Sequence, residues 1–206
     1  MKLFKTPKFV SWWYPKRIWA FSKTSHTIYL TFDDGPIPEV TPWVLDVLKG
    51  FNAKATFFCI GDNVRKHPDL FKRIVDEGHT LGNHTYHHLK GTKTKTEAYL
   101  KDVVAFEGTT NQPVQWFRPP YGKMRAAQAR GIQKRGYTIV MWSILSYDWD
   151  SGVSEEQCLE NVQKHLSPGS IVVFHDSLKA EKNLRYALPR VLESIREKGW
   201  NVSGVA

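Results

Sequence analysis

The feature that most constrains the fold is a regular alternation of segments that starts at about residue 27. Short runs of apolar and β-branched residues, such as "TIYLTF" and "IVVF", alternate with amphipathic stretches of helical periodicity. One stretch opens with Ser154 and carries Gln157 three residues later, a pattern close to a capping box that predicts a helix start. Alternating strands and helices form right-handed βαβ units on a parallel sheet. We therefore predict an α/β protein, a compact (β/α) barrel of about seven units, short of the usual eight, in a single domain.

The expected elements follow from this alternation, and no internal linker or repeat interrupts them. Strands are expected at residues 26–32, 53–61, 79–84, 114–120, 137–144, 169–176 and 200–205. Helices are expected at residues 39–49, 64–77, 96–110, 124–135, 154–166 and 182–198. Residues 1–26 do not follow the pattern, and we interpret them as a basic and aromatic extension that precedes the domain of residues 27–206.

The composition is that of a globular protein with a cationic surface. Hydrophobic residues make up 41% of the chain, which is enough to bury a core, and the two cysteines, Cys59 and Cys158, are too few for a disulfide framework. The formal net charge of +9 favours polyanionic partners such as nucleic acid, anionic lipid or acidic cell-wall polymer. Because no block of consecutive basic residues occurs, we expect no nucleic-acid partner.

The first 23 residues, "MKLFKTPKFVSWWYPKRIWAFSK", are basic and aromatic, and prolines and charges interrupt every apolar run. No signal peptide is evident, and no stretch approaches the ~20 apolar residues of a membrane span. We therefore expect either a cytoplasmic protein or the mature form of a secreted or cell-envelope protein. We also expect the protein to be a monomer. Trp12, Trp13 and Trp19 are expected to pack on the domain, with contact to a membrane interface as the alternative.

Polar side chains gather at one end of the predicted strands. The residues that end a predicted strand or lie in the turn after it are Asp33, Asp34, His84, His88, Arg118, Tyr121, Asp148 and His175. In a parallel barrel the C-terminal ends of the strands converge on one mouth, where catalytic groups lie. Position and periodicity alone therefore predict an active site at this mouth.

A metal site is expected within this group. His84 and His88 are spaced i, i+4, which on a helical turn would place both imidazoles within reach of one ion. With one carboxylate from the adjacent pair Asp33 and Asp34, they make a three-ligand site with open positions. This set suits catalytic zinc, and it also describes the facial triad of a non-haem Fe(II) site.

Five motifs occur in order along the chain: "TFDDGP", "HTYHH", "RPPYG", "SYDWD" and "IVVFHD". Together they resemble the motifs of polysaccharide deacetylases, the NodB-homology domains of carbohydrate esterase family 4. The resemblance spans nearly all of residues 27–206, which would form the catalytic domain. It implies a distorted (β/α) barrel and a metal-dependent hydrolase. Zinc is the expected metal, with cobalt or nickel as alternatives.

The resemblance also implies a role for each motif residue. Asp34, His84 and His88 correspond to the metal ligands, and His87 is a spacer. Asp33 corresponds to the general base that activates the attacking water, and His175 to the general acid that protonates the departing amine. The partners and substrate contacts that the motifs imply are Arg118 beside the base, Asp148 beside the acid, and Pro120, Tyr121 and Trp149 at the substrate. From the residues alone, Asp148 as a loop cap and Trp149 as a core residue remain alternatives.

One motif departs from the family pattern, because Leu145 stands where the fourth motif has its first aspartate. A carboxylate that would support Arg118 or a sugar subsite is therefore missing. The function that the resemblance implies is removal of N-acetyl groups from N-acetylglucosamine oligomers or polymers such as chitooligosaccharide or peptidoglycan. The alternatives are an O-deacetylase acting on acetylated xylan and, more remotely, a non-catalytic carbohydrate-binding protein.

Overall fold

A single parallel sheet, curled on itself, forms the centre of the protein. The computed structural model describes residues 3–205. The strands are β1 (Arg17–Ile18), β2 (Thr27–Asp33), β3 (Thr56–Cys59), β4 (Thr80–Asn83), β5 (Trp116–Phe117), β6 (Thr138–Val140), β7 (Ile144–Leu145), β8 (Ile171–His175) and β9 (Asn201–Ser203). They follow the order β1-β6-β5-β4-β3-β2-β8-β7, with β9 also on β2, and every pairing between them is parallel. The predicted distorted (β/α) barrel in one domain is confirmed.

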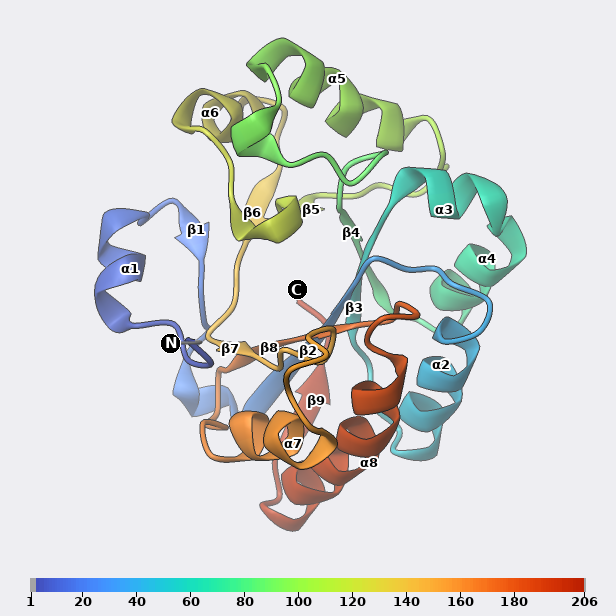
Figure 1. Cartoon of the computed structure of the whole chain (residues 1–206), viewed down its shortest axis with the longest axis vertical. Helices are drawn as coiled ribbons and strands as arrows, with labels where there is room; N and C mark the ends of the chain where they lie inside the picture. Colours follow the sequence, from blue (N-terminus) through green and yellow to red (C-terminus); the bar gives the residue numbers. More distant parts are fainter. Residues whose placement is uncertain (1–2, 206) are drawn as a thin grey trace.

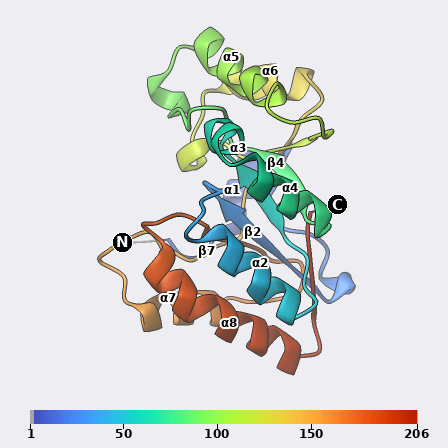
Figure 2. The same ribbon diagram turned by 90° about the vertical axis from the view of Figure 1, so that its right-hand side faces the viewer.

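The helices lie outside the curled sheet (Figure 1; Figure 2). They are α1 (Lys8–Trp13), α2 (Thr41–Gly50), α3 (Gly61–Lys66), α4 (Pro68–Asp76), α5 (Thr96–Glu107), α6 (Ala126–Lys134), α7 (Glu155–Gln163) and α8 (Glu181–Glu197). Short 3₁₀ turns cover Lys23–Ser25, Gly91–Lys93 and Pro120–Gly122. The predicted capping box is present at α7, where Ser154 and Gln157 cap each other's backbone. Among residues 3–205, no helix has both the length and the apolar character that crossing a bilayer requires.

Two predicted elements are each divided in the structure. The helix expected at residues 64–77 is two helices that meet at His67, because a residue before a proline is disfavoured in the helical region and Pro68 starts the second helix. The strand expected at residues 137–144 is also two strands. β6 pairs with β1 and β5, whereas β7 pairs with β8 near the other end of the strand order. Residues 141–143 therefore carry the chain across the open side of the barrel.

The N-terminal segment helps to cover this open side. The amide of Thr6 donates to the carbonyl of Ser143 at 2.9 Å, and the amide of Leu145 donates to the carbonyl of Phe4 at 2.9 Å. Further along, the amide of Met141 donates to the carbonyl of Ile18 at 2.7 Å. The segment before residue 27 is thus built into the same sheet as the rest of the chain.

The tryptophans of this segment differ in their surroundings. Trp19 is half-buried and packs against the apolar cluster beneath α5 and α6, as expected. Trp12 and Trp13 leave 77% and 78% of their surface exposed, so the expectation that they pack on the domain is wrong. The physical reason is that α1 is only six residues long and lies at the edge of the fold, where no sheet face is left to cover both indoles (Figure 1).

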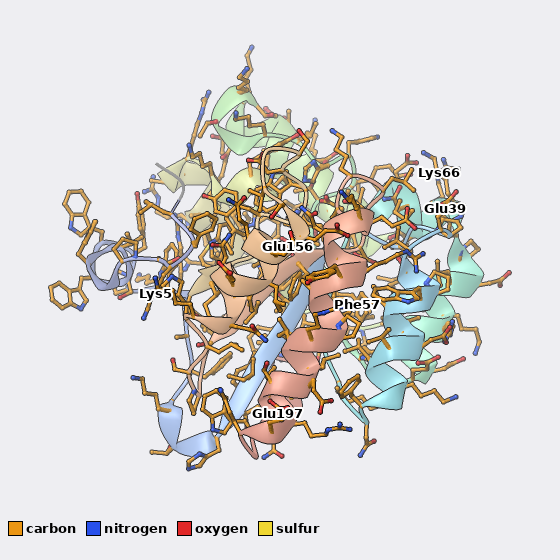
Figure 3. The ribbon with its side chains drawn as sticks, turned by 60° about the horizontal axis from the view of Figure 1, so that its bottom comes forward. Lys5, Glu39, Phe57, Lys66, Glu156 and Glu197 are labelled. Atoms are coloured by element: carbon orange, nitrogen blue, oxygen red, sulfur yellow. The ribbon has the colours of Figure 1, made fainter. Side chains whose placement is uncertain are left out.

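The main core fills the space between the sheet and helices α2, α4, α7 and α8. Phe57 lies at its centre on β3, with its ring 5.1 Å from that of Phe32, which in turn faces Phe174 at 6.2 Å (Figure 3). Both cysteines are buried and unpaired, so they are small core residues here. The core supports the strands whose ends carry the polar groups described next.

Candidate active site

The predicted polar residues meet at the C-terminal end of the sheet. In the strand register Asp33 lies opposite His175 on β8, so the last residues of β2 and β8 are neighbours. A pocket of about 550 Å³ opens there, and its lining includes Asp33, Asp34, His84, His88 and His175. The lining also includes Tyr121, Trp142, Leu145, Trp149 and Leu178. Arg118 and Asp148 lie buried behind this surface, and Pro120 is buried in the 3₁₀ turn without lining the pocket.

Asp34, His84 and His88 form a group that could hold a metal ion, with one potential ligand atom from each within 4.8 Å of the others. The Oδ1 atom of Asp34 lies 3.3 Å from Nε2 of His88 and 3.8 Å from Nε2 of His84. This oxygen is buried and has no hydrogen-bond partner among the residues described. A buried carboxylate oxygen without a partner is costly unless a cation binds it, so the donor set fits a divalent metal.

Both imidazoles are in the form that a metal requires. Burial lowers the pKa of His84, and burial together with repulsion from His84 lowers the pKa of His88 to about 4. Both rings are therefore neutral at pH 7. Nδ1 of His84 donates to the carbonyl of Arg118 at 2.7 Å, which leaves the Nε2 lone pair facing the Asp34 carboxylate. Two neutral imidazoles and one carboxylate are a typical donor set for a catalytic metal.

The two histidines are not brought together by a helical turn, as the i, i+4 spacing suggested. Residues 84–90 form an irregular loop in which Thr85 and His88 have positive φ angles of 64° and 56°. The buried carboxylate of Asp102 on α5 accepts hydrogen bonds from the amides of Tyr86 and His87, at 3.0 and 2.9 Å. Nδ1 of His87 also lies 2.5 Å from this carboxylate, which turns the ring of His87 away from the ligands.

The Asp33 carboxylate is held by Arg118, whose side chain is fully buried. Arg118 donates from Nη1 to Oδ1 of Asp33 at 2.7 Å and to the hydroxyl of Thr31 at 2.6 Å. It also donates to the carbonyls of Val140 and Met141 at 3.2 and 2.9 Å. Burial disfavours a charged Asp33, but Arg118, with help from nearby imidazoles, more than offsets burial and lowers the pKa of Asp33. Asp33 is therefore an anion at neutral pH.

The His175 imidazole is held by Asp148 in a comparable way. Nδ1 of His175 donates to Oδ1 of Asp148 at 2.9 Å, and the backbone amide of His175 donates to Oδ2 at 2.7 Å. Burial alone would lower the pKa of His175, but the Asp148 carboxylate raises it to about 9. His175 thus carries a proton at neutral pH. Asn183 on α8 fixes the Asp148 loop by donating to the carbonyls of Asp148 and Val153.

Three residues that support the site were missed by sequence reasoning: Asp102, Asn183 and Asp176. Asp176 accepts from the amide of Gly35 at 3.0 Å and from the hydroxyl of Thr41 at 2.6 Å. Burial raises its pKa to about 8 despite these hydrogen bonds. A Cβ atom on Gly35 would meet Oδ2 of Asp176 at 1.9 Å, so the turn after Asp34 requires glycine. Asp176 offered a signal, because it adjoins His175 in the last motif, whereas Asp102 and Asn183 lie within helix patterns.

Aromatic side chains form the walls of the pocket. The ring of Trp149 lies 4.5 Å from that of His175 and 5.1 Å from that of Tyr147. On the other side, the ring of Tyr121 lies 4.7 Å from that of His88, and Tyr121 is 58% exposed. Its φ angle of 59° places its backbone in the left-handed region. The site thus joins a three-ligand metal group, an anionic carboxylate and a protonated imidazole beneath an aromatic rim.

The comparison with protein families decides what kind of protein carries this site. The family model described as "Polysaccharide deacetylase" matches residues 22–140, which is more than half of the chain. The chain belongs to the polysaccharide deacetylase family. It is a hydrolase of carbohydrate esterase family 4, as the motifs indicated.

Individual relatives agree with this assignment. The chain is 36% identical to a peptidoglycan-N-acetylglucosamine deacetylase of Bacillus cereus, over 91% of this chain and 70% of that protein. It is 31% identical to chitin deacetylase 2 of Saccharomyces cerevisiae, over 85% of this chain and 57% of that protein. The crystal structure of the Bc1960 peptidoglycan N-acetylglucosamine deacetylase matches with a TM-score of 0.88 at 33% identity, covering 97% of this chain and 95% of that one.

The departure from the family pattern at Leu145 has a local structural setting. Leu145 ends β7, lines the pocket and is 9% exposed. The Arg118 guanidinium already donates to Asp33, Thr31 and two carbonyl oxygens, so it needs no further carboxylate for support. In this member of the polysaccharide deacetylase family, the leucine makes one wall of the pocket apolar.

Proposed function

We propose that this protein removes N-acetyl groups from N-acetylglucosamine-containing glycans, with peptidoglycan as the leading substrate and chitooligosaccharide as the second. The observation that carries the proposal is the pairing of an anionic Asp33 with a protonated His175 beside a three-ligand metal group. Amide hydrolysis needs both a base for water and an acid for the nitrogen leaving group. The surroundings of Asp33 lower its pKa and those of His175 raise its pKa. The pair therefore provides a base and an acid at the same pH.

Asp34, His84 and His88 would hold a divalent cation, for which two imidazoles and a carboxylate favour zinc, with cobalt or nickel as alternatives. When bound, this ion supplies a Lewis acid that polarises the acetyl carbonyl and makes water more acidic. The fit rests on the unpartnered Oδ1 of Asp34 and on the two neutral imidazoles.

The residues of the chain then have separate tasks. Asp33 accepts a proton from the attacking water, because Arg118 keeps its carboxylate ionised and fixes its orientation. His175 donates the proton that the departing amine requires, because its Nδ1 is engaged by Asp148 and its remaining ring nitrogen is left for the pocket. Tyr121 and Trp149 flank the acetylated sugar, and the backbone amide of Tyr121 is proposed to donate to the developing oxyanion.

Two observations favour peptidoglycan as the substrate. The B. cereus relatives are named as peptidoglycan-N-acetylglucosamine deacetylases. The formal net charge of +9 also attracts an anionic cell-wall polymer more strongly than uncharged chitin. An acetyl ester would be an easier substrate for the same groups, so O-deacetylation of xylan is an outcome that the test below distinguishes.

The experiment measures acetate release from peptidoglycan, chitooligosaccharide and acetylated xylan, before and after chelation and after metal add-back. Activity on the N-acetylated substrates that is lost on chelation and restored by zinc is expected. Release from xylan alone would refute the N-deacetylase proposal, and release that survives full chelation would refute the metal assignment.

A matched pair of variants separates the two adjacent aspartates. Asp33→Asn should lower kcat by about 10²–10⁴-fold while the protein still binds zinc in equilibrium dialysis, because only the base is removed. Asp34→Asn should weaken zinc binding itself. If both variants bind zinc equally well, the division of roles between base and ligand is wrong.

A further inference from the structure

The N-terminal segment presents to solvent a group of large apolar side chains, four of them aromatic, that the proposed catalytic function does not use. We call it the aromatic patch, and it consists of Leu3, Phe9, Trp12, Trp13 and Tyr14. These side chains are 45–78% exposed, and they are five of the eight exposed large hydrophobic residues in the described part of the chain. Two of the other three, Tyr121 and Leu178, line the catalytic pocket. A concentration of apolar surface within twelve residues of one another marks an interaction site.

The arrangement of the patch follows from helix geometry. Phe9, Trp12 and Trp13 are spaced i, i+3, i+4 on α1, so their side chains share one side of the helix. Figure 3 shows aromatic side chains of α1 projecting away from the rest of the molecule, with Lys5 labelled nearby. The exposed indoles therefore face outward, and no element among residues 3–205 covers them.

The patch is attached firmly to the domain at both of its ends. Before α1, the amide and the hydroxyl of Thr6 donate to the carbonyls of Ser143 and Trp142, at 2.9 and 2.8 Å. After α1, Nε2 of Gln133 donates to the carbonyl of Lys16 at 2.9 Å, and β1 pairs with β6. The exposed side chains thus stand on a backbone that is tied to the sheet.

The charge of this segment differs sharply from that of the rest of the chain. Residues 1–26 contain six Lys and Arg residues and no Asp or Glu, so they carry two thirds of the formal net charge of +9. Lys5 and Lys16 are exposed on either side of α1, and the guanidinium of Arg17 lies 4.1 Å from the centre of the Tyr14 ring. Exposed indoles surrounded by basic side chains are typical of segments that lie in the interface of an anionic membrane.

We propose that the aromatic patch docks this protein onto the headgroup region of an anionic lipid bilayer. Trp and Tyr rings place an apolar body among the acyl chains and a polar atom among the headgroups, while lysines at the rim meet the lipid phosphates. A second copy of the chain fits this surface less well, because pairing two patches would bring two segments of the same positive charge together. A neutral glycan would leave the basic residues without counter-charges, and an anionic glycan is the alternative occupant that sedimentation with insoluble glycan tests below.

Docking through the patch would also orient the catalytic pocket. Residues 4–6 are bonded to residues 143–145, and Leu145 lines the pocket. A bilayer bound at α1 would therefore hold the mouth of the barrel in one orientation relative to the membrane. The glycan strands within reach would be those that lie close to the membrane surface.

The test is co-sedimentation of the whole protein with large unilamellar vesicles. Vesicles that contain phosphatidylglycerol should bind the protein, vesicles of phosphatidylcholine alone should bind it much more weakly, and binding should weaken as salt rises above about 0.1 M. The double variant Trp12→Ala, Trp13→Ala should lose at least roughly tenfold in partitioning, because most of the inserted area is removed. Its acetate release from a soluble oligosaccharide should stay unchanged.

Matched single variants separate local charge from total charge. Lys16→Glu reverses a charge beside the patch, and Lys49→Glu makes the same change on the exposed surface of α2, on the opposite side of the fold from α1 (Figure 1). Both variants lower the net charge by the same amount. Lys16→Glu should nevertheless weaken vesicle binding several-fold more than the control variant does, because its charge lies beside the patch. The proposal is overturned if phosphatidylglycerol vesicles do not bind the protein or if the double variant binds them as well as the wild type. The proposal is also overturned if the double variant differs from the wild type only in sedimentation with insoluble glycan, which would indicate a glycan site. The same holds if it differs only in self-association measured by ultracentrifugation, which would indicate a contact between copies of the chain.

Discussion

Two buried ion pairs lie at the ends of the neighbouring strands β2 and β8, and they differ in whether their cation can release a proton. Asp33 is paired with Arg118 at 2.7 Å, and Asp148 is paired with His175 at 2.9 Å. A guanidinium stays charged at every accessible pH, so the first pair keeps a carboxylate permanently ionised. An imidazolium titrates, so the second pair keeps a proton that can be given away and recovered.

The surroundings of the two pairs match this difference. Arg118 is fully buried, lies 4.1 Å from the Phe58 ring and donates to two backbone carbonyls, so its position is fixed by the sheet itself. The His175 side chain keeps 14% of its surface exposed and lines the pocket, so water and substrate can reach it. In each pair the residue that we propose to take part in the reaction, Asp33 or His175, lines the pocket and its partner lies behind.

The largest effect is expected from breaking the first pair. Arg118→Met should lower the free energy of unfolding by about 3–5 kcal/mol, because it leaves Asp33 as a buried charge without a partner. Urea denaturation of the metal-free protein measures this change. Arg65→Met is the matched control, since Arg65 is paired with Asp62 on the exposed surface of α3, where solvent screens the pair and its loss should change stability far less. Equal effects of the two variants would contradict a special role for the buried pair.

A smaller, pH-dependent effect is expected from breaking the second pair. The pKa of His175 is about 9 in the folded protein against 6.5 for a free histidine, so its pairing stabilises the fold fully below pH 6.5 and this contribution is lost as the pH rises through 9. In Asp148→Asn, burial prevails and the pKa of His175 falls. The stability difference between wild type and variant should therefore be largest below pH 6.5 and should shrink toward pH 9.

Chelator-treated samples, unfolded in urea at a series of pH values, give this comparison directly. Kinetics provide a second measurement, because activity of the metal-loaded variant should decline at a lower pH than activity of the wild type. A stability difference that does not change between pH 6 and pH 10 would mean that Asp148 only holds the loop together and does not set the protonation of His175.

The smallest effect is expected at the position where the chain departs from its family. Leu145→Asp restores the carboxylate of the fourth motif, but the donors of Arg118 are already taken up by Asp33, Thr31 and two carbonyl oxygens. We expect kcat/KM for N-acetylated oligosaccharide to change by less than roughly tenfold. A larger gain in kcat/KM would show that the missing carboxylate limits the enzyme. Leu145→Asn, whose side chain has the shape of aspartate without its charge, would then separate the effect of charge from that of shape.

Several features of the site could be predicted because they depend on order along the chain. Strand ends in a parallel barrel meet at one mouth, so residues as distant as Asp33 and His175 were expected together from position alone. The motifs also imply a division of roles between Asp33 and Asp34, which stays a prediction. Periodicity also predicted the helix after Ser154, because a capping box is a local signal that neighbouring residues satisfy among themselves.

Other features could not be predicted because distant contacts decide them. The run at residues 137–144 looks like one strand, and its division into β6 and β7 depends on which strands lie on either side of the barrel opening. The spacing of His84 and His88 suggested a helical turn, but the Asp102 carboxylate holds the loop in another shape. The exposure of Trp12 and Trp13 depends on whether any sheet face remains to cover α1.

The sequence by itself determined the fold class, the mouth where the chemistry gathers and the residue types that gather there, since alternation and motif order are properties of the chain. Only the tertiary structure decided the protonation states, because the pKa values of Asp33 and His175 depend on the burial and partners that folding creates. It also decided which aromatic side chains enter the core and which remain in solvent. Burial is a property of the packed whole, and no local pattern of residues encodes it.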